Sequence, residues 1–245
     1  MTQLRQVILS LFLFGIVTTS SAQEKTQRTA QDQFYVSVAM LGLSWYSTGP
    51  DTKWYNNALS IGVMYDKPLG KGPISIAGGL GLSVYNYHSN LRVADGRLVG
   101  NAIPLIESDS TWHGYHPLLK ESEFMKNKMT WTYLDIPLEL RFRTKPNNKN
   151  NYFKFNFGLK LGLLLQSHSK LVTEDFTEKY INFNHLIKYD ISPSIGIGYG
   201  RWSIQSSIGF APIRTIAGSS YEWDSSDEPM KYTVGITYHI SKYAN

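Results

Sequence analysis

The sequence has 245 residues, of which 42% are hydrophobic, 13% aromatic and 18% charged, and it contains no cysteine. The apolar content argues against intrinsic disorder, because such a chain can bury enough apolar surface to fold. The lack of cysteine excludes disulfide bonds and thiolate metal sites. The net charge of +5 is too small to indicate nucleic-acid binding.

The first 22 residues predict a secretory signal peptide. Arg5 precedes an uncharged apolar run from Val7 to Val17, and small residues follow as far as Ala22, after which we expect cleavage. The run is shorter than the roughly 20 apolar residues of a membrane-spanning helix. We interpret residues 23–33 as a flexible N-terminal segment and residues 34–245 as one folded domain.

From Phe34 onward apolar residues recur with a period of two, which predicts strands, and no convincing helical spacing extends over 11 or more residues. Phe153, Phe155 and Phe157, for example, alternate with Lys154 and Asn156. The alternation predicts eight strands, at Phe34–Leu43, Asn57–Asp66, Ile74–Tyr87, Met129–Arg143, Tyr152–Gln166, Ile187–Tyr199, Trp202–Phe210 and Tyr232–Ile240.

The polar faces of these strands are rich in glycine and serine, which suit the crowded interior of a small barrel better than a water-facing surface. Short connections with turn residues, at Lys67–Pro73, Lys145–Asn151 and Gly200–Arg201, alternate with long ones, of which residues 88–128 are the longest. We therefore predict an all-β, eight-stranded antiparallel up-and-down transmembrane β-barrel, with short periplasmic turns and long extracellular loops, in the outer membrane of a Gram-negative-type cell. The alternative is a soluble, lipocalin-like ligand-binding barrel whose apolar faces point inward.

Aromatic residues are expected in two bands where the barrel meets the membrane surfaces. The predicted periplasmic band contains Tyr65, Phe142, Phe153, Tyr199, Trp202 and Tyr232. The predicted outer band contains Trp45, Tyr85, Tyr87, Trp131, Tyr133, Tyr189 and Phe210.

Charged residues on the inward faces of the middle strands predict a structural polar network that fills the lumen. Its expected members are Asp135, Glu139, Arg141, Lys154, Lys160, Lys188 and Asp190. If the short turn pairs Arg143 with Tyr152, Asp135 lies opposite Lys160, and Pro137 should produce a bulge or kink, because proline cannot donate to the ladder. A narrow gated pore is the alternative use of such a network.

Catalytic and metal-binding signals are weak. Ser167, His168 and Ser169 could serve a membrane lipid-modifying hydrolase, but adjacent strand residues point to opposite faces and no acid partner is evident. His113 and His116 are too few for a metal site. We expect no enzyme activity and no cofactor.

The longest loop offers the best candidate for recognition. It carries Trp112, His113, Tyr115 and His116, and aromatic side chains held on a rigid scaffold suit binding. A self-packed lid is the alternative interpretation of this loop.

The segment Tyr133–Arg141, YLDIPLELR, resembles the mid-chain strand motif of the PorT-like outer-membrane β-barrel family. The strands Ala77–Val84, Phe157–Leu163 and Ser194–Tyr199 are similar to that family as well. The resemblance implies an integral outer-membrane protein with outer-membrane lipid as a partner. Because one named member serves protein secretion, it also implies other envelope or secretion proteins as partners.

Overall fold

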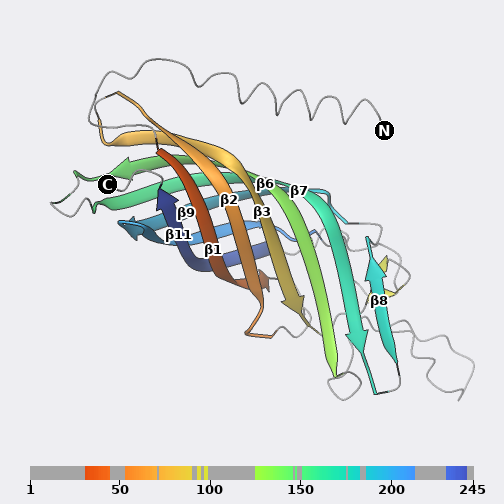
Figure 1. The fold of residues 1–245 in the computed structure, drawn as a ribbon. Coiled ribbons are helices and arrows are strands. Elements are labelled where there is room, and N and C mark those ends of the chain that lie inside the picture. The colour runs from red at the N-terminus through yellow and green to blue at the C-terminus, as the bar shows by residue number, and fades with distance from the viewer. Residues whose placement is uncertain are drawn as a thin grey trace, which may run out of the picture.

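The computed structural model shows an all-β barrel with a slanted rim (Figure 1). It describes residues 31–44, 53–70, 72–89, 93–94, 97–98, 125–145, 147, 151–174, 176–182, 186–212 and 230–241. The expected signal peptide, Trp45 and most of the longest loop, including Trp112, His113, Tyr115 and His116, lie outside these ranges.

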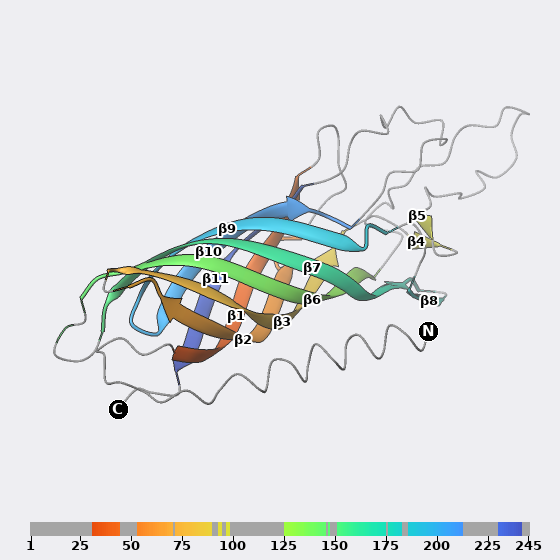
Figure 2. The same ribbon diagram turned by 90° about the horizontal axis from the view of Figure 1, so that it is seen from above.

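Eight strands close into an antiparallel barrel, as predicted (Figure 2). They are β1 (Gln31–Ser44), β2 (Asn57–Pro68), β3 (Ile74–His88), β6 (Lys126–Arg143), β7 (Phe153–Val172), β9 (Tyr189–Tyr199), β10 (Trp202–Phe210) and β11 (Met230–Ser241). Each pairs with its neighbours in this order, and β11 returns to pair with β1. The all-strand, up-and-down prediction is confirmed.

Three further strands lie outside the closed ring. Val93–Ala94 (β4) and Arg97–Leu98 (β5) form a two-residue pair, and Thr177–Ile181 (β8) pairs with the far end of β7. Two neighbouring barrel strands are much longer than β10 on the opposite side of the barrel. The β6 strand has 18 residues and β7 has 20, whereas β10 has 9. The β6, β7 and β8 strands therefore extend beyond the rest of the barrel at the long-loop end, as Figure 1 shows.

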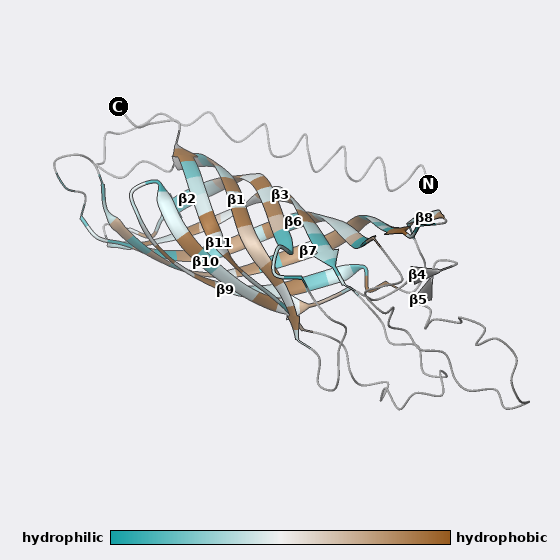
Figure 3. Cartoon of the chain, turned by 90° about the horizontal axis from the view of Figure 1, so that it is seen from below, coloured by the Kyte–Doolittle hydropathy of each residue, from teal (hydrophilic) through white to brown (hydrophobic). Residues whose placement is uncertain are grey.

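The apolar faces of the strands point outward. Val38, Leu59 and Ile236 are direct partners across β2, β1 and β11, and their exposed fractions are 55%, 46% and 54%. Figure 3 shows the resulting alternation of hydrophobic and hydrophilic residues along the barrel wall. A soluble lipocalin-like barrel would place these side chains inside, so the structure excludes that alternative.

Small residues on the inward faces make room for larger ones. A Cβ atom built on Gly62 or Gly81 would lie 2.7 or 2.2 Å from the hydroxyl oxygen of Tyr35. The Tyr35 side chain therefore occupies space that only glycine leaves free at those two positions. Among the described residues, no helix is long and apolar enough to cross a membrane.

The predicted β6–β7 register is wrong by two residues. Arg143 pairs with Lys154 rather than Tyr152, because Tyr152 belongs to the turn, where its carbonyl accepts a hydrogen bond from the Gly200 amide at 3.0 Å. Asp135 is consequently paired with Gly162, and Lys160 with Pro137. A shift of two keeps every side chain on its expected face.

The predicted bulge at Pro137 is also wrong. At this proline the pairing of β6 with β3 skips from Gly78–Leu138 to Gly81–Asp135 without a change of register. The irregularity of β6 and β7 lies instead between Thr132 and Tyr133, close to where β7 exchanges its neighbour β9 for β8. A bulge bends and twists a strand, which suits the point where the wall leaves the closed barrel.

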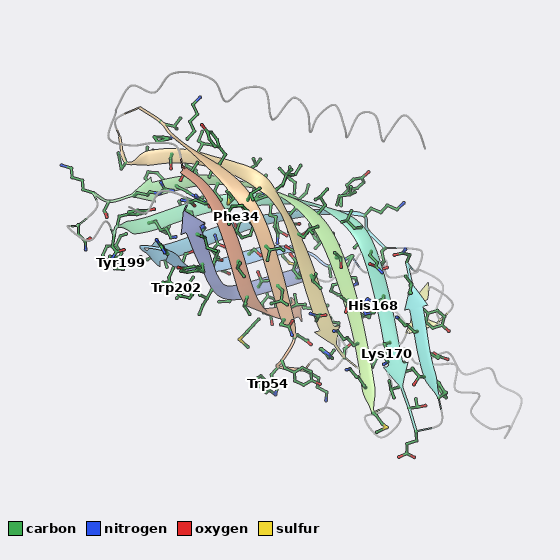
Figure 4. The ribbon with its side chains drawn as sticks, viewed as in Figure 1. Phe34, Trp54, His168, Lys170, Tyr199 and Trp202 are labelled. Atoms are coloured by element: carbon green, nitrogen blue, oxygen red, sulfur yellow. The ribbon has the colours of Figure 1, made fainter. Side chains whose placement is uncertain are left out.

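The aromatic band at the short-turn end is present. Tyr65, Phe142, Phe153, Tyr199 and Trp202 all face outward and are 37–62% exposed. Figure 4 shows Phe34, Tyr199 and Trp202 near this end of the barrel. The predicted place of Tyr232 in this band is wrong. Tyr232 faces outward but lies near the start of β11, at the long-loop end.

At the long-loop end, Tyr189 and Phe210 are the only described members of the predicted band that are outward and exposed. Tyr85, Tyr87, Trp131 and Tyr133 are at most 1% exposed and fill the lumen. Each of these four residues occupies an inward-facing position in the alternation of its strand, as Asp135 does. The face of the strand, rather than nearness to its end, therefore decides where these side chains point.

Candidate functional site: the lumen network and the outer rim

A cluster of charged side chains fills the lumen near the short turns. Arg141 is at its centre: its guanidinium lies 3.2 Å from Asp66 Oδ2 and 2.7 Å from Glu139 Oε2, and it donates to Gln33 Oε1 at 2.9 Å. Arg143 also contacts Asp66. This cluster joins β1, β2 and β6, which are not all neighbours in the barrel.

The same cluster continues across the lumen through neutral side chains. Gln205 donates to Glu139 Oε1 at 3.2 Å, and Thr237 donates to Gln205 Oε1 at 2.8 Å. Since these residues belong to β6, β10 and β11, the hydrogen bonds connect opposite walls of the barrel. The arrangement is a transverse strut that leaves no wide passage at this level.

A second cluster lies closer to the long-loop end. Lys231 Nζ lies 2.6 Å from Asp190 Oδ2, and Lys160 Nζ lies 3.8 Å from Asp135 Oδ2. Lys160 also donates to the Tyr85 hydroxyl at 2.5 Å. The two lysines therefore balance the two aspartates within a largely buried site, as a desolvated set of charges requires.

Six of the seven predicted lumen residues take inward positions. Asp135, Arg141, Lys154 and Asp190 are at most 8% exposed, and the Glu139 and Lys160 side chains are 9% and 19% exposed. The predicted place of Lys188 in the lumen is wrong, because this residue precedes β9 and is exposed.

Sequence reasoning missed Asp66 and Lys231, which are each 1% exposed. Both continue the inward parity of a predicted strand, Asp66 after Met64 and Lys231 before Thr233. Asp66 is the last residue of the predicted strand Asn57–Asp66, and extending the predicted strand Tyr232–Ile240 by one residue would have found Lys231.

Between the two clusters lies a cavity of about 80 Å³. Its polar lining includes Ser37, Ser60, Gln205, Ser207 and Thr237. This is room for a few water molecules with several hydrogen-bonding partners, and much less than a ligand pocket of several hundred Å³.

An aromatic layer closes the lumen above the second cluster. Tyr87 stacks on Trp131 with ring centroids 6.0 Å apart, and Tyr85 meets Tyr133 edge-on at 5.8 Å. Leu41, Leu43, Ala58, Met129 and Ala211 complete this buried cluster. The two charged clusters and this aromatic layer thus fill most of the described lumen, with the 80 Å³ cavity between them.

The predicted serine and histidine pair is not assembled. Ser167 and Ser169 are buried on the inner face, whereas His168 lies on the outer face of β7. The structure does bring another pair together, with Ser203 Oγ 3.3 Å from His239 Nε2, but both residues are buried inside the barrel. Among the described residues, His239 Nδ1 has no hydrogen-bond partner. Without a carboxylate to orient the imidazole or a path for substrate, this pair lacks the features of a catalytic triad.

No group of three or more histidine, aspartate or glutamate side chains within the described ranges could hold a metal ion. The predicted recognition residues of the longest loop lie outside these ranges, so the structure does not place them.

The outer rim carries a concentration of basic groups. A groove of about 460 Å³ is lined by Lys53, Tyr55, His88, Ser89, Met125, Lys126 and Asn127. Burial, followed by the nearby positive charges of Lys128 and Lys126, lowers the pKa of His88. Burial, followed by Lys128 and Lys179, likewise lowers the pKa of His168.

Comparison with known proteins bears on this architecture. The sequence model of a family described as "Outer membrane protein beta-barrel domain" matches residues 21–226. Comparison with curated proteins finds no match.

Two solved structures are similar at low identity. One is Ail, the attachment invasion locus protein of Yersinia pestis, in complex with the heparin analogue sucrose octasulfate; identity is 9% over 87% of this chain and 100% of that one, with a TM-score of 0.34. The other, described as "Asymmetric conductivity of engineered proteins", is 7% identical over 86% of this chain and 100% of that one, with a TM-score of 0.21. The family match spans most of the sequence, and the chain therefore belongs to the outer membrane protein β-barrel domain family.

Proposed function

We propose that this protein is a non-enzymatic interaction protein that uses a closed barrel to hold a recognition surface at the outer face of the membrane. The observation that best supports this proposal is the contrast between a filled lumen and a rim that projects on one side. Two charged clusters and an aromatic layer fill the interior, while β6, β7 and β8 project past the shorter strands.

The filled lumen supports a scaffold rather than a conduit. The transverse strut and the aromatic layer lie on either side of a cavity of only about 80 Å³. Eight-stranded barrels have interiors just wide enough to be filled by side chains. The charged residues of the lumen accordingly hold the barrel walls together.

The raised rim supports a role in recognition. Binding residues are commonly carried on segments that a rigid scaffold positions, and the 460 Å³ groove at the rim falls within the usual size range of ligand sites. We assign Trp112, His113, Tyr115 and His116 of the longest loop to the same surface. The PorT-like resemblance of Tyr133–Arg141 supports protein secretion or assembly in the envelope as the setting.

Photo-crosslinking in intact cells tests this function. A photoreactive residue at Trp112 or Tyr115 should give a discrete adduct with another envelope or surface molecule. The same residue at Lys145, in a short turn at the opposite end, provides the control. Absence of adducts from both loop positions, together with unchanged growth after deletion of residues 90–119, would contradict the recognition role and favour a lid.

Planar-bilayer recordings test the pore alternative. We expect the wild-type protein and the Lys160→Ala variant to give the same closed baseline, because the aromatic layer remains when the Lys160–Asp135 contact is lost. Steady conductance through the wild-type barrel, altered by Lys160→Ala, would contradict the scaffold role.

A further inference from the structure

Four basic side chains form a continuous row across β3, β6, β7 and β8 at the long-loop end of the barrel; we call this projecting part of the barrel the raised wall. His88 on β3 pairs with Lys128 on β6, Lys128 pairs with Lys170 on β7, and Lys170 pairs with Lys179 on β8. Directly opposed residues in a sheet project from the same face, with Cβ atoms about 5 Å apart. The row therefore places four cationic or titratable groups side by side on the outward face.

Further basic groups flank the row on the same face. Lys126 lies two residues from Lys128, and His168 lies two residues from Lys170. Figure 4 shows His168 and Lys170 together on the part of β7 that extends along the raised wall. We call His88, Lys126, Lys128, His168, Lys170 and Lys179 the basic band.

The band has no counter-charge in the part of the chain that the structure describes. None of Lys126, Lys128, Lys170 and Lys179 forms an ion pair with a described carboxylate. Glu178 is adjacent to Lys179 but projects from the opposite face of β8, and Glu174 lies in the turn between β7 and β8. Like charges directly opposite in a sheet are destabilising, so the described fold leaves this repulsion without compensation.

The band lies beyond the lipid-facing surface, on its outer side. The outward apolar residues of β6 and β7 end at Leu134 and Leu165, and Lys128 and Lys170 lie six and five residues beyond them. Five or six residues of a strand span about 17–20 Å, and less along the membrane normal because barrel strands are tilted. The lysines therefore lie on the headgroup side of the lipid-facing surface.

We propose that the basic band binds phosphate groups on the headgroups of the lipids that surround the barrel in the outer leaflet. Phosphate oxygens accept the several hydrogen bonds that neighbouring ammonium groups donate, and their charge removes the repulsion within the row. Lipid is favoured over a soluble anion because the band is continuous with the lipid-facing wall and shares its outward face.

One end of the band is shaped to hold a headgroup. His88 and Lys126 contribute to the 460 Å³ groove at the rim. The Tyr55 ring packs edge-on against His88 at 4.9 Å, and Asn56 Oδ1 lies 3.3 Å from His88 Nδ1. These contacts hold the imidazole with Nδ1–H donating to Asn56 Oδ1, so Nε2 can donate to a phosphate oxygen once the imidazole is protonated.

Native mass spectrometry of the full barrel tests the proposal. Protein released from micelles containing phosphatidic acid and phosphatidylcholine should retain phosphatidic acid preferentially. The K128Q/K170Q/K179Q variant should lose this preference by about tenfold or more, since each lysine near an anionic surface contributes measurably to binding. A matched variant, K67Q/K145Q/R201Q, removes three exposed cations from the short-turn end and should retain the preference.

Heat-modifiable gel mobility establishes whether each variant is folded. If K128Q/K170Q/K179Q does not fold, the single variant K170Q takes its place. Equal phosphatidic acid retention by the wild type and the folded band variant would overturn the proposal. So would band-dependent binding of inorganic phosphate without lipid preference, which would indicate a soluble anion. The loop crosslinking experiment is independent of both results.

Discussion

Lys231 on β11 forms its ion pair with Asp190 on β9 by passing over β10, the strand that separates them. The residue of β10 directly beside Lys231 is Gly209, whose missing side chain leaves the space that the pair occupies. Lys231 Nζ also lies 4.3 Å from the centre of the Tyr85 ring, on the other side of the lumen. One lysine thus links three strands that share no backbone hydrogen bonds with one another.

Removing this lysine should destabilise the barrel strongly. Lys231→Met leaves Asp190 buried beside Ser192 with no cation 2.6 Å away, so we expect a loss of about 3–5 kcal/mol in unfolding free energy. Urea unfolding in lipid vesicles, followed by heat-modifiable gel mobility, measures the loss. The K231M/D190N double variant should recover most of it; a double variant as unstable as K231M would show that packing rather than charge is responsible.

Enlarging Gly209 should have a similar effect by a different route. A Cβ atom there would lie 2.1 Å from Ser192 Oγ and 2.9 Å from Asp190 Oδ1. Gly209→Leu should therefore displace the ion pair and cost about 1–3 kcal/mol or more in unfolding free energy. Gly72→Leu is the control, because its nearest neighbour is Leu69 O at 3.8 Å; equal stability of the two variants would contradict the role of Gly209.

Charge on the outward face should be tolerated according to depth. Leu138 faces outward midway between Leu134 and Phe142, in the apolar part of β6. Leu138→Arg should cost about 2–4 kcal/mol in unfolding free energy, whereas Thr132→Arg, near the rim, should cost at most about 1 kcal/mol. The same vesicle unfolding assay compares them, and equal costs would mean that lipid does not cover the middle of β6.

Phosphate binding by the basic band should depend on pH through His88 and His168. Because burial and neighbouring lysines lower both pKa values below the ordinary 6.5, both imidazoles are neutral at pH 7 and gain a proton only at lower pH. Bound phosphate favours the protonated forms, so acidification should strengthen retention.

The comparison that isolates this effect is wild type against H88N/H168N, since a phosphate monoester also loses charge near pH 6. Native mass spectrometry from pH 7.5 to 5.5 should show the wild type gaining phosphatidic acid relative to the variant. The charged groups facing these histidines are Lys126, Lys128 and Lys179. Parallel profiles for the two proteins would exclude the histidines from binding.

The strands and their lumen-facing positions were predictable because alternation is a local property. Val38 and Ile61 point to lipid, and Asp135 and Arg141 point inward, as the period of two requires. The closed barrel followed from the same period together with the alternating connection lengths.

The contacts inside the barrel were not predictable to the same degree. Which residues meet across the lumen depends on the register of every intervening strand, and the β6–β7 turn displaced the expected Asp135–Lys160 pairing by two residues. The two side chains still approach within 3.8 Å, because a shift of two preserves the face. The link from Lys231 to Asp190 depends on two registers, that of β9 with β10 and that of β10 with β11, and the long connection between β10 and β11 leaves the second unspecified in the sequence.

The raised wall ends in β8, which pairs with β7 alone among the described strands. An edge strand of this kind can recruit a strand from another copy of the same protein. Lys179 lies in the middle of this five-residue edge. Two copies pairing edge to edge would bring like charges together, so we expect Lys179 to oppose such pairing.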